Sequence, residues 1–303
     1  MTVDAGKKRA GFAALIGAPN AGKSTLVNAL VGSKVAIVSH KVQTTRTRIR
    51  GIAMIGQTQL ILVDTPGIFI PKRRLDRAMV QAAWSEAAEA DVAVLIVDAA
   101  RGIDEEVEPV LEKIGGVKPD VVLVLNKIDK VKKDSLLTLA TALTARARFA
   151  GVFMVSAQDG SGVDDLRADL AARLPESEWL FPEDQVADVP LRQMAAEITR
   201  EKLYHRLHDE LPYASTVETT AWKKLNDGSI RIEQTIFVER DSQRKIVLGH
   251  KGETIKWLSM TARKDIIEVA ASPVHLFLFV KVRDNWGEDP ERYREMGLEY
   301  PKG

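Results

Sequence analysis

An eight-residue loop near the start of the chain constrains its fold most. The loop reads Gly17-Ala18-Pro19-Asn20-Ala21-Gly22-Lys23-Ser24 and is followed by Thr25. It matches the pattern G-x4-G-K-[ST], follows a short apolar run and precedes a stretch of helical periodicity. Backbone N–H groups of such a loop can face phosphates, while Lys23 places its charge on the β and γ oxygens and Ser24 offers its hydroxyl to Mg²⁺. The motif predicts a nucleotide-binding domain.

Short apolar runs alternate with longer helical stretches over the first half of the chain. The expected strands are residues 11–16, 51–55, 59–63, 92–97, 121–125 and 152–155. The expected helices are residues 23–32, 74–90, 104–115, 134–149 and 163–173. Near-continuous Val, Ile and Leu strands separated by helices are typical of a sheet covered on both faces. Residues 10–175 are therefore predicted to form a doubly wound, mostly parallel α/β domain, after an N-terminal tail of residues 1–9.

A polar motif after the run 121–125 indicates which base is bound. It reads Asn126-Lys127-Ile128-Asp129. The carboxylate of Asp129 can accept hydrogen bonds from both N1–H and the exocyclic amine of guanine, whereas adenine would leave it desolvated and unpaired. Asn126 and the stem of Lys127 would frame the ring. The chain is therefore expected to bind GTP and GDP.

Two further segments follow strands of the same predicted sheet. Asp64-Thr65-Pro66-Gly67 ends the run 59–63, where the carboxylate can reach Mg²⁺ through water and the N–H of Gly67 can meet the γ-phosphate. Ser156 and Ala157 follow the last strand and could present N–H groups to the guanine oxygen, which only their position supports.

Taken in order, these motifs resemble the guanine-nucleotide motif set of the small, translation-factor-related GTPases. In that family the Thr that precedes an Arg in the first switch binds Mg²⁺ in the GTP state. This chain has Gln43-Thr44-Thr45-Arg46 at the corresponding place. The resemblance assigns the role to Thr45, with Thr44 as the alternative, and residues 34–50 are expected to be mobile without γ-phosphate.

The pattern breaks into Pro-punctuated, acidic sequence after Pro175, so residues 176–190 are predicted to be a linker. A helix at 192–210, strands at 215–225 and 229–240, a helix at 253–270 and a strand at 274–282 follow. The strands 215–225 and 229–240 are joined by Asn226-Asp227-Gly228, a hairpin signal. The order α-β-β-α-β predicts a smaller α+β domain at 191–285 and leaves 286–303 as a C-terminal tail.

The four residues Gly249-His250-Lys251-Gly252 form a Gly-x-x-Gly loop before the second of these helices. About one such tetrapeptide is expected by chance in a chain with this Gly content. The alternative to a binding loop is a tight strand-to-helix turn with no role in binding. Its place in the α-β-β-α-β order, however, is where KH domains clamp a single-stranded RNA backbone. Lys245, Lys251, Lys256 and Arg263 are then candidate RNA contacts.

Net charge alone argues weakly against nucleic acid, because 43 Lys and Arg nearly cancel 42 Asp and Glu. The charges are segregated, however: residues 34–50 hold five basic and no acidic residues, and residues 240–283 hold nine basic and four acidic. Residues 284–303 are acidic.

The absence of Cys excludes disulfides, thiol nucleophiles and Cys-type zinc sites. No apolar run approaches the roughly 18 residues of a membrane span.

One G domain, an acidic linker and a KH-like domain together resemble the Era family of bacterial GTPases over about residues 10–285. The resemblance implies a factor for 30S ribosomal subunit assembly and maturation that, in its GTP state, grips the 3′ end of 16S rRNA. Some members also contact the inner membrane peripherally. We expect a cytoplasmic monomer, partly peripheral at the inner membrane.

Ile68 stands where Ras-type enzymes place a water-orienting Gln. Because an apolar side chain cannot orient water, hydrolysis is expected to rest on Mg²⁺, Lys23 and backbone N–H groups such as that of Gly67, with slow basal turnover. As in related GTPases with the same loop Asn, Asn20 is hypothesised to hold a monovalent cation such as K⁺.

Two alternative functions compete with this one. A tandem-domain ribosome GTPase of the Der kind needs two phosphate loops, and the chain has one. A membrane-recruited regulatory GTPase would use its C-terminal domain to bind protein or lipid, and it would need basic and aromatic residues interleaved on one exposed helix.

Overall fold

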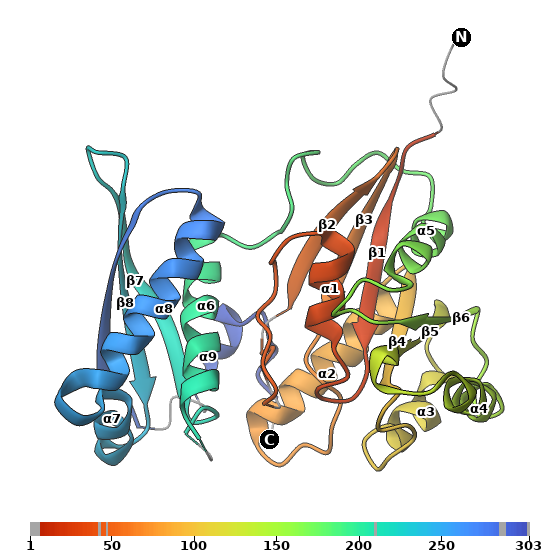
Figure 1. Ribbon diagram of the computed structural model, residues 1–303, viewed down its shortest axis with the longest axis horizontal. Helices are drawn as coiled ribbons and strands as arrows, with labels where there is room; N and C mark the ends of the chain where they lie inside the picture. Colours follow the sequence, from red (N-terminus) through yellow and green to blue (C-terminus); the bar gives the residue numbers. More distant parts are fainter. Residues whose placement is uncertain (1–6, 42–43, 47, 209–210, 285–288, 302–303) are drawn as a thin grey trace, which may run out of the picture. The chain divides into compact units, whose positions relative to one another are not determined.

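The structure is a computed structural model that describes residues 7–41, 44–46, 48–208, 211–284 and 289–301. The chain divides into two compact units, each built on its own sheet (Figure 1). Unit 1 comprises Met1–Ala36, Thr45–Asp188 and Met296–Gly303. Unit 2 comprises Ile37–Thr44 and Val189–Glu295. Residues 37–44, which lie inside the predicted G domain, therefore belong to the second unit.

Unit 1 contains a six-stranded sheet in the order β2-β3-β1-β4-β5-β6. Its strands are β1 (Arg9–Ile16), β2 (Ile49–Ile55), β3 (Thr58–Asp64), β4 (Val92–Asp98), β5 (Asp120–Asn126) and β6 (Gly151–Val155). Strand β2 is antiparallel to β3, and all other neighbours are parallel. The predicted doubly wound, mostly parallel sheet is confirmed.

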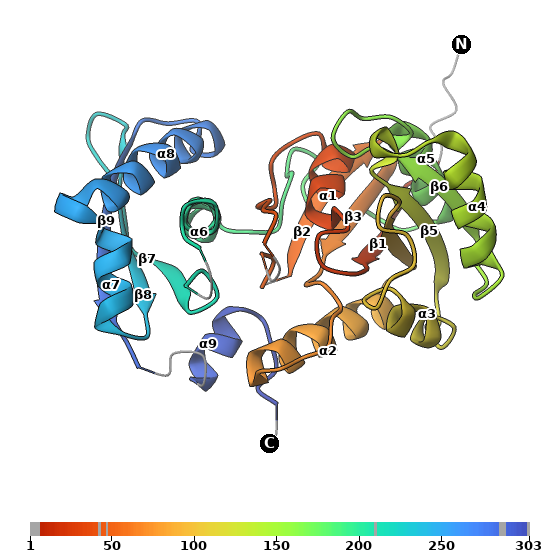
Figure 2. The same ribbon diagram turned by 60° about the horizontal axis from the view of Figure 1, so that its bottom comes forward.

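Helices cover both faces of this sheet, which is why its strands are uniformly apolar. Helices α1 (Lys23–Val31) and α5 (Val163–Arg173) pack on one face, where Leu26 and Leu166 meet β1 and β3 side chains. Helices α2 (Arg74–Glu89), α3 (Glu108–Ile114) and α4 (Lys133–Thr144) cover the other (Figure 2). Helix α3 begins later than predicted because Asp104 Oδ1 accepts the N–H groups of Glu106 and Val107 in a preceding turn.

The predicted linker lies along the edge of the sheet of unit 1 rather than running free. Ile52 N–H donates to Val186 O at 2.9 Å, and Asp188 N–H donates to Arg50 O at 3.0 Å. The fully buried amide of Gln59 accepts the N–H of Leu180 at 2.8 Å. The stretch buries few side chains, as its composition suggested, but its backbone hydrogen-bonds to the edge strand β2.

Unit 2 contains a three-stranded sheet covered on one face by helices. Its strands are β7 (Ser215–Lys224), β8 (Ile230–Val238) and β9 (Val274–Val282), with β7 antiparallel and β9 parallel to β8. The core residues of helices α6 (Leu191–Arg206) and α8 (Glu253–Ala270) pack against those of the sheet.

Two helices of the second half were not predicted. Helix α7 (Asp241–Leu248) lies between β8 and the Gly-x-x-Gly loop, so the order is α-β-β-α-α-β and the predicted α-β-β-α-β was wrong at this point. The sequence does not reveal α7 because Val247 is the only residue of this helix that is buried, so the helix has no periodic apolar face. Helix α9 (Pro290–Glu295) falls in the predicted tail. Among the described helices, none combines the length and the hydropathy that crossing a membrane requires.

Candidate functional site

The polar motifs of unit 1 meet at one edge of the sheet, because the carboxyl ends of parallel strands lie on the same side. The loop after β1 contacts the segment after β3: Ile68 N–H donates to Gly17 O at 3.0 Å. Thr65 Oγ1 donates to Leu15 O at 2.6 Å. A Cβ on Gly67 would lie 3.1 Å from the backbone of Pro19, so only glycine fits here without a shift.

Lys23 lies buried beneath the phosphate loop. Its Nζ donates to the carbonyls of Gly17 at 3.0 Å and Ala18 at 2.9 Å, with 6% of the residue exposed. Burial lowers the pKa of Lys23 to about 8, against the opposing attraction of Asp64 and Glu106. A charge held in this way favours an anionic group above the loop.

Three oxygen ligands converge beside Lys23. Ser24 Oγ lies 2.7 Å from Asp64 Oδ2 and 3.0 Å from Thr45 Oγ1, and Thr45 Oγ1 lies 3.1 Å from Asp64 Oδ2. Burial raises the pKa of Asp64 to about 6, although the hydroxyls of Ser24 and Thr45 and the charge of Lys23 lower it.

This oxygen set fits Mg²⁺, a hard cation that prefers oxygen ligands. Asp64 Oδ1 is buried and has no hydrogen-bond partner among the residues that the structure describes. Thr44, the alternative to Thr45, instead donates its hydroxyl to Lys41 O at 2.7 Å. The geometry thus favours Thr45, while Gln43 of the same motif lies outside the described residues.

The residues that follow β5 and β6 form the other end of the site. Asn126 Nδ2 donates to Ala21 O at 2.9 Å, and its Oδ1 accepts the N–H of Ala157 at 3.1 Å. Ser156 Oγ donates to Asp129 Oδ1 at 2.8 Å. The buried Asn126 therefore connects the phosphate loop to the loop that follows β6. Asp129 stays exposed.

Sequence reasoning missed Asp98, which is the last residue of β4. Its Oδ2 accepts a hydrogen bond from Lys127 Nζ at 2.7 Å, and the same Nζ donates to Asn20 O at 2.6 Å. The position at a strand's carboxyl end could have identified it, as it did Asp64 and Asn126. Asn20 has a positive φ of 61° and an exposed side chain.

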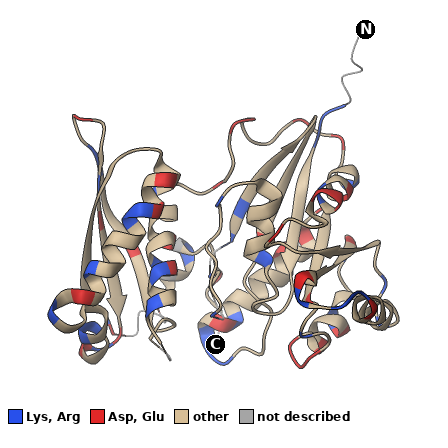
Figure 3. Ribbon diagram, in the orientation of Figure 1, with Lys and Arg blue, Asp and Glu red and all other residues tan. Residues whose placement is uncertain are grey.

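The Gly-x-x-Gly loop of unit 2 joins α7 to α8. Gly249 has φ of 74°, and a Cβ there would lie 2.4 Å from Thr254 Oγ1, so the tight turn requires glycine. His250 and Lys251 are exposed, while Gly252 caps the start of α8. Lys245, Lys256 and Arg263 are exposed as well, and Lys and Arg recur along α7 and α8 (Figure 3).

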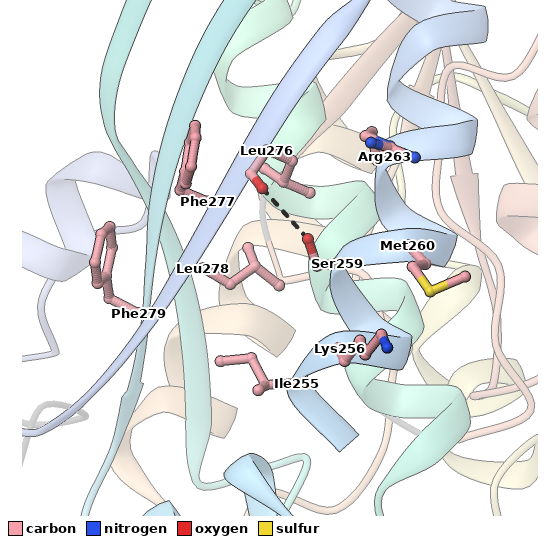
Figure 4. Close-up of a pocket in the computed structure, with 9 residues that line it drawn as sticks. All are labelled: Ile255, Lys256, Ser259, Met260, Arg263, Leu276, Phe277, Leu278 and Phe279. Carbon is pink, nitrogen blue, oxygen red and sulfur yellow. Dashed lines mark hydrogen bonds between the residues drawn. The ribbon is translucent and has the colours of Figure 1, made fainter. Parts of the chain in front are cut away.

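A groove runs from this loop between α8 and the edge strand β9 (Figure 4). Its walls are apolar side chains bordered by two of the predicted RNA contacts. The lining residues are Ile255, Lys256, Ser259, Met260 and Arg263 of α8 with Leu276, Phe277, Leu278 and Phe279 of β9. An apolar floor with basic borders suits nucleic-acid bases and phosphates. The apolar members were missed, although Leu276 and Leu278 have the spacing of one strand face.

Residues 37–41, which precede Thr45, are held by α6 of unit 2. Val38 N–H donates to Glu201 Oε1 at 2.9 Å, and Val38 O lies 3.1 Å from His205 Nε2. Lys41 Nζ donates to Leu207 O. Ile37 is fully buried. Just before them, Asn28 of α1 binds the backbone of Val35 and Ala36.

Comparison with known proteins identifies the family. The family described as 50S ribosome-binding GTPase matches residues 12–127, and the KH domain family matches residues 210–287. GTPase Era of Afipia carboxidovorans is 65% identical over 97% of this chain and 96% of its own length. The chain belongs to the Era family of GTPases. GTPase Era of Brucella suis is 61% identical over 98% of this chain and 96% of its own.

Solved Era structures share the fold along nearly the whole chain. Era in complex with MgGDPNP and nucleotides 1506–1542 of 16S ribosomal RNA is 36% identical, with a TM-score of 0.91 over 96% of this chain and 99% of its own. A point variant of Aquifex aeolicus Era bound to GDP.AlF4⁻ is also 36% identical, with a TM-score of 0.90 over 95% of this chain and 99% of its own. The chain is therefore an Era-family GTPase, as the motifs predicted.

Proposed function

We propose that this GTPase binds single-stranded RNA of the 3′ end of 16S rRNA in its KH groove and assists assembly of the small ribosomal subunit. A related Era carries 16S rRNA nucleotides 1506–1542 in its structure. The groove between α8 and β9 supports the same ligand class here, because apolar walls lie between basic side chains and a loop that lets phosphates approach.

Binding is proposed to depend on GTP, and the contact of residues 37–41 with α6 is the observation that carries this. The contact joins the chain segment before Thr45 to the first helix of the KH unit through Glu201 and His205. Lys202, next to Glu201, pairs with Asp265 of α8. Thr45 already lies beside Ser24 and Asp64, so a bound metal ion would hold it there. Loss of that contact after hydrolysis would release the segment and alter its hydrogen bonds to α6.

The residues near the phosphates hold roles in hydrolysis that follow from their positions. Ser24, Thr45 and, through water, Asp64 would hold Mg²⁺, which would supply positive charge to the phosphates. Lys23 would add a buried positive charge, and the N–H of Gly67 would donate a hydrogen bond to the γ-phosphate. Ile68 is buried and cannot orient water, so basal turnover is proposed to be slow.

A monovalent cation at Asn20 is proposed as a further hydrolytic aid. The exposed amide oxygen lies on a loop whose backbone carbonyl is fixed by Lys127. K⁺ should then accelerate hydrolysis severalfold over Na⁺ in the wild type, and Asn20→Ala should remove the difference. Equal rates in K⁺ and Na⁺ for the wild type would contradict this role.

The membrane-recruited alternative gains no support from α6. Ten of its side chains are buried, from Met194 to Tyr204, so the helix is a core element and not an exposed amphipathic one. The proposal keeps the expected location and state: a cytoplasmic monomer that is partly peripheral at the inner membrane.

Salt-dependent binding of a short oligonucleotide of the 16S rRNA 3′ end tests the function. We expect tight binding with a GTP analogue, weaker binding with GDP, and loss of binding in Lys251→Glu. The matched control is Lys118→Glu, which makes the same charge change at an exposed site of unit 1 outside the nucleotide motifs. Equal binding by Lys251→Glu and wild type would refute the groove as the RNA site.

A further inference from the structure

The sheet of unit 2 has a second face, opposite the one that α6 and α8 cover. All four residues from Leu276 to Phe279 border the groove, but their side chains alternate along β9. Those of Leu276 and Leu278 point toward α8, whereas the rings of Phe277 and Phe279 point to the other side of the strand (Figure 4). The two rings are 40% and 46% exposed. Two residues apart on one strand, they lie about 7 Å from each other along it.

Basic side chains surround the two rings on this face. The cross-strand register places Lys223, Arg231 and His275 side by side in one row across β7, β8 and β9. Lys281 follows Phe279 on the same face of β9, and it is exposed, as are Lys223 and His275. Cations thus border the aromatic pair at both ends.

Arg231 is already fixed against the nearer ring. Its guanidinium carbon lies 4.3 Å from the centre of Phe277. Glu233 of the same strand accepts hydrogen bonds from Arg231 at 2.8 Å and 3.0 Å, which neutralises that carboxylate and holds the guanidinium over the ring. Glu218 of β7 is the other acidic residue among the rows beside these rings.

We propose that this face, defined by Phe277, Phe279, Arg231 and Lys281, is a second contact surface for single-stranded RNA. Exposed rings spaced along a strand stack bases, and flanking cations attract phosphates; sheet faces of this chemistry bind single strands without strict sequence preference. The inference rests on the proposed RNA-binding function and extends the RNA path beyond the groove.

Two observations favour RNA over a protein partner as the occupant. The centres of protein interfaces are depleted of charged residues, whereas here each ring adjoins a cation. The surface is also continuous with the groove, because both are faces of the edge strand β9. RNA that leaves the groove around this edge meets Phe277 and Phe279 directly.

The double variant Phe277→Leu/Phe279→Leu tests the surface, because Leu keeps the apolar volume and removes the stacking face. Its affinity for an RNA of 16S nucleotides 1506–1542 should fall between about fivefold and a hundredfold. Leu137→Ala, which alters an exposed apolar residue of unit 1, should bind as the wild type does. Lys281→Ala should reduce the salt dependence of binding.

The single variant Phe279→Trp gives a direct reading of stacking. It should keep the wild-type affinity, and its added indole emission, relative to the wild type, should be quenched when this RNA saturates the protein. Wild-type affinity in the double Leu variant, or no added quenching in the Trp variant, would overturn the proposal. Because Lys251→Glu reports on the groove separately, RNA binding that needs Lys251 but not the rings would refute this surface alone.

Discussion

At the scale of single residues, the nucleotide site holds two buried ionisable groups whose charged forms burial disfavours. The pKa of Lys23 falls to about 8 and that of Asp64 rises to about 6, both mainly because water is removed from them. A bound phosphate favours the charged form of Lys23, and a bound cation favours that of Asp64. Ligand binding and protonation are therefore coupled at this site.

The lowered pKa of Lys23 predicts that nucleotide binding takes up a proton at high pH. At pH 8.5 its folded, ligand-free form is largely neutral, since the pH lies above a pKa of about 8. Bound phosphates raise that pKa, so GDP binding should take up a fraction of a proton at pH 8.5. At pH 6.5 Lys23 is already charged, and Asp64 and the terminal phosphate of GDP release protons instead, so the net uptake should be lower than at pH 8.5. Calorimetric titrations in two buffers of different ionisation enthalpy measure the uptake. Equal uptake at both pH values would contradict the assignment.

Asp129→Asn tests the base contact at the same scale. The variant loses the charged acceptor for N1–H and the amine of guanine, so GDP should bind about tenfold to several hundredfold more weakly. An amide can donate to a carbonyl, so the variant should instead favour xanthosine diphosphate, which carries oxygen in place of that amine. Competition between the two labelled nucleotides measures the change. Unaltered preference for GDP would show that Asp129 does not contact the base.

At the scale of elements, sequence reasoning located every strand among the described residues, those of unit 1 because buried strands have near-continuous apolar runs. It also located the four nucleotide motifs, at residues 17–24, 64–67, 126–129 and 156–157, since each lies at the end of a strand. It failed at α7, which holds one buried residue. It also failed at residues 176–188, which hydrogen-bond through their backbone to β2, a strand more than a hundred positions earlier in the chain. Local composition encodes neither feature, because edge pairing depends on backbone groups and not on side-chain pattern.

The loop between α7 and α8 offers a matched pair of variants. Gly249→Ala forces a side chain into Thr254 at positive φ, whereas Gly252→Ala has a similar φ of 82° and open space around it. Gly252→Ala should cost about 1 kcal/mol of unfolding free energy, and Gly249→Ala more. Denaturant titration compares them, and RNA affinity should fall further in Gly249→Ala. Equal stability of the two variants would contradict the described packing.

At the scale of the whole molecule, residues 37–41 precede Thr45 of the nucleotide site in the chain and hydrogen-bond to α6 of unit 2. Sequence reasoning placed them in the G domain, because their neighbours in the chain are there. Their partners Glu201 and His205 lie more than 160 positions away, a separation that no motif reports. On the proposed mechanism, the nucleotide state reaches the KH unit through these bonds, which is expressed as a coupling free energy between GTP and RNA.

That coupling is measured most directly as the ratio of RNA affinities with a GTP analogue and with GDP. The wild type should show a ratio of about tenfold or more, within the usual range of allosteric coupling. Glu201→Ala, which removes the acceptor for Val38 N–H, should bring the ratio close to one while GDP affinity is retained. Glu268→Ala, an equal charge change at an exposed position of α8, should keep the wild-type ratio. A wild-type ratio in Glu201→Ala would contradict the account.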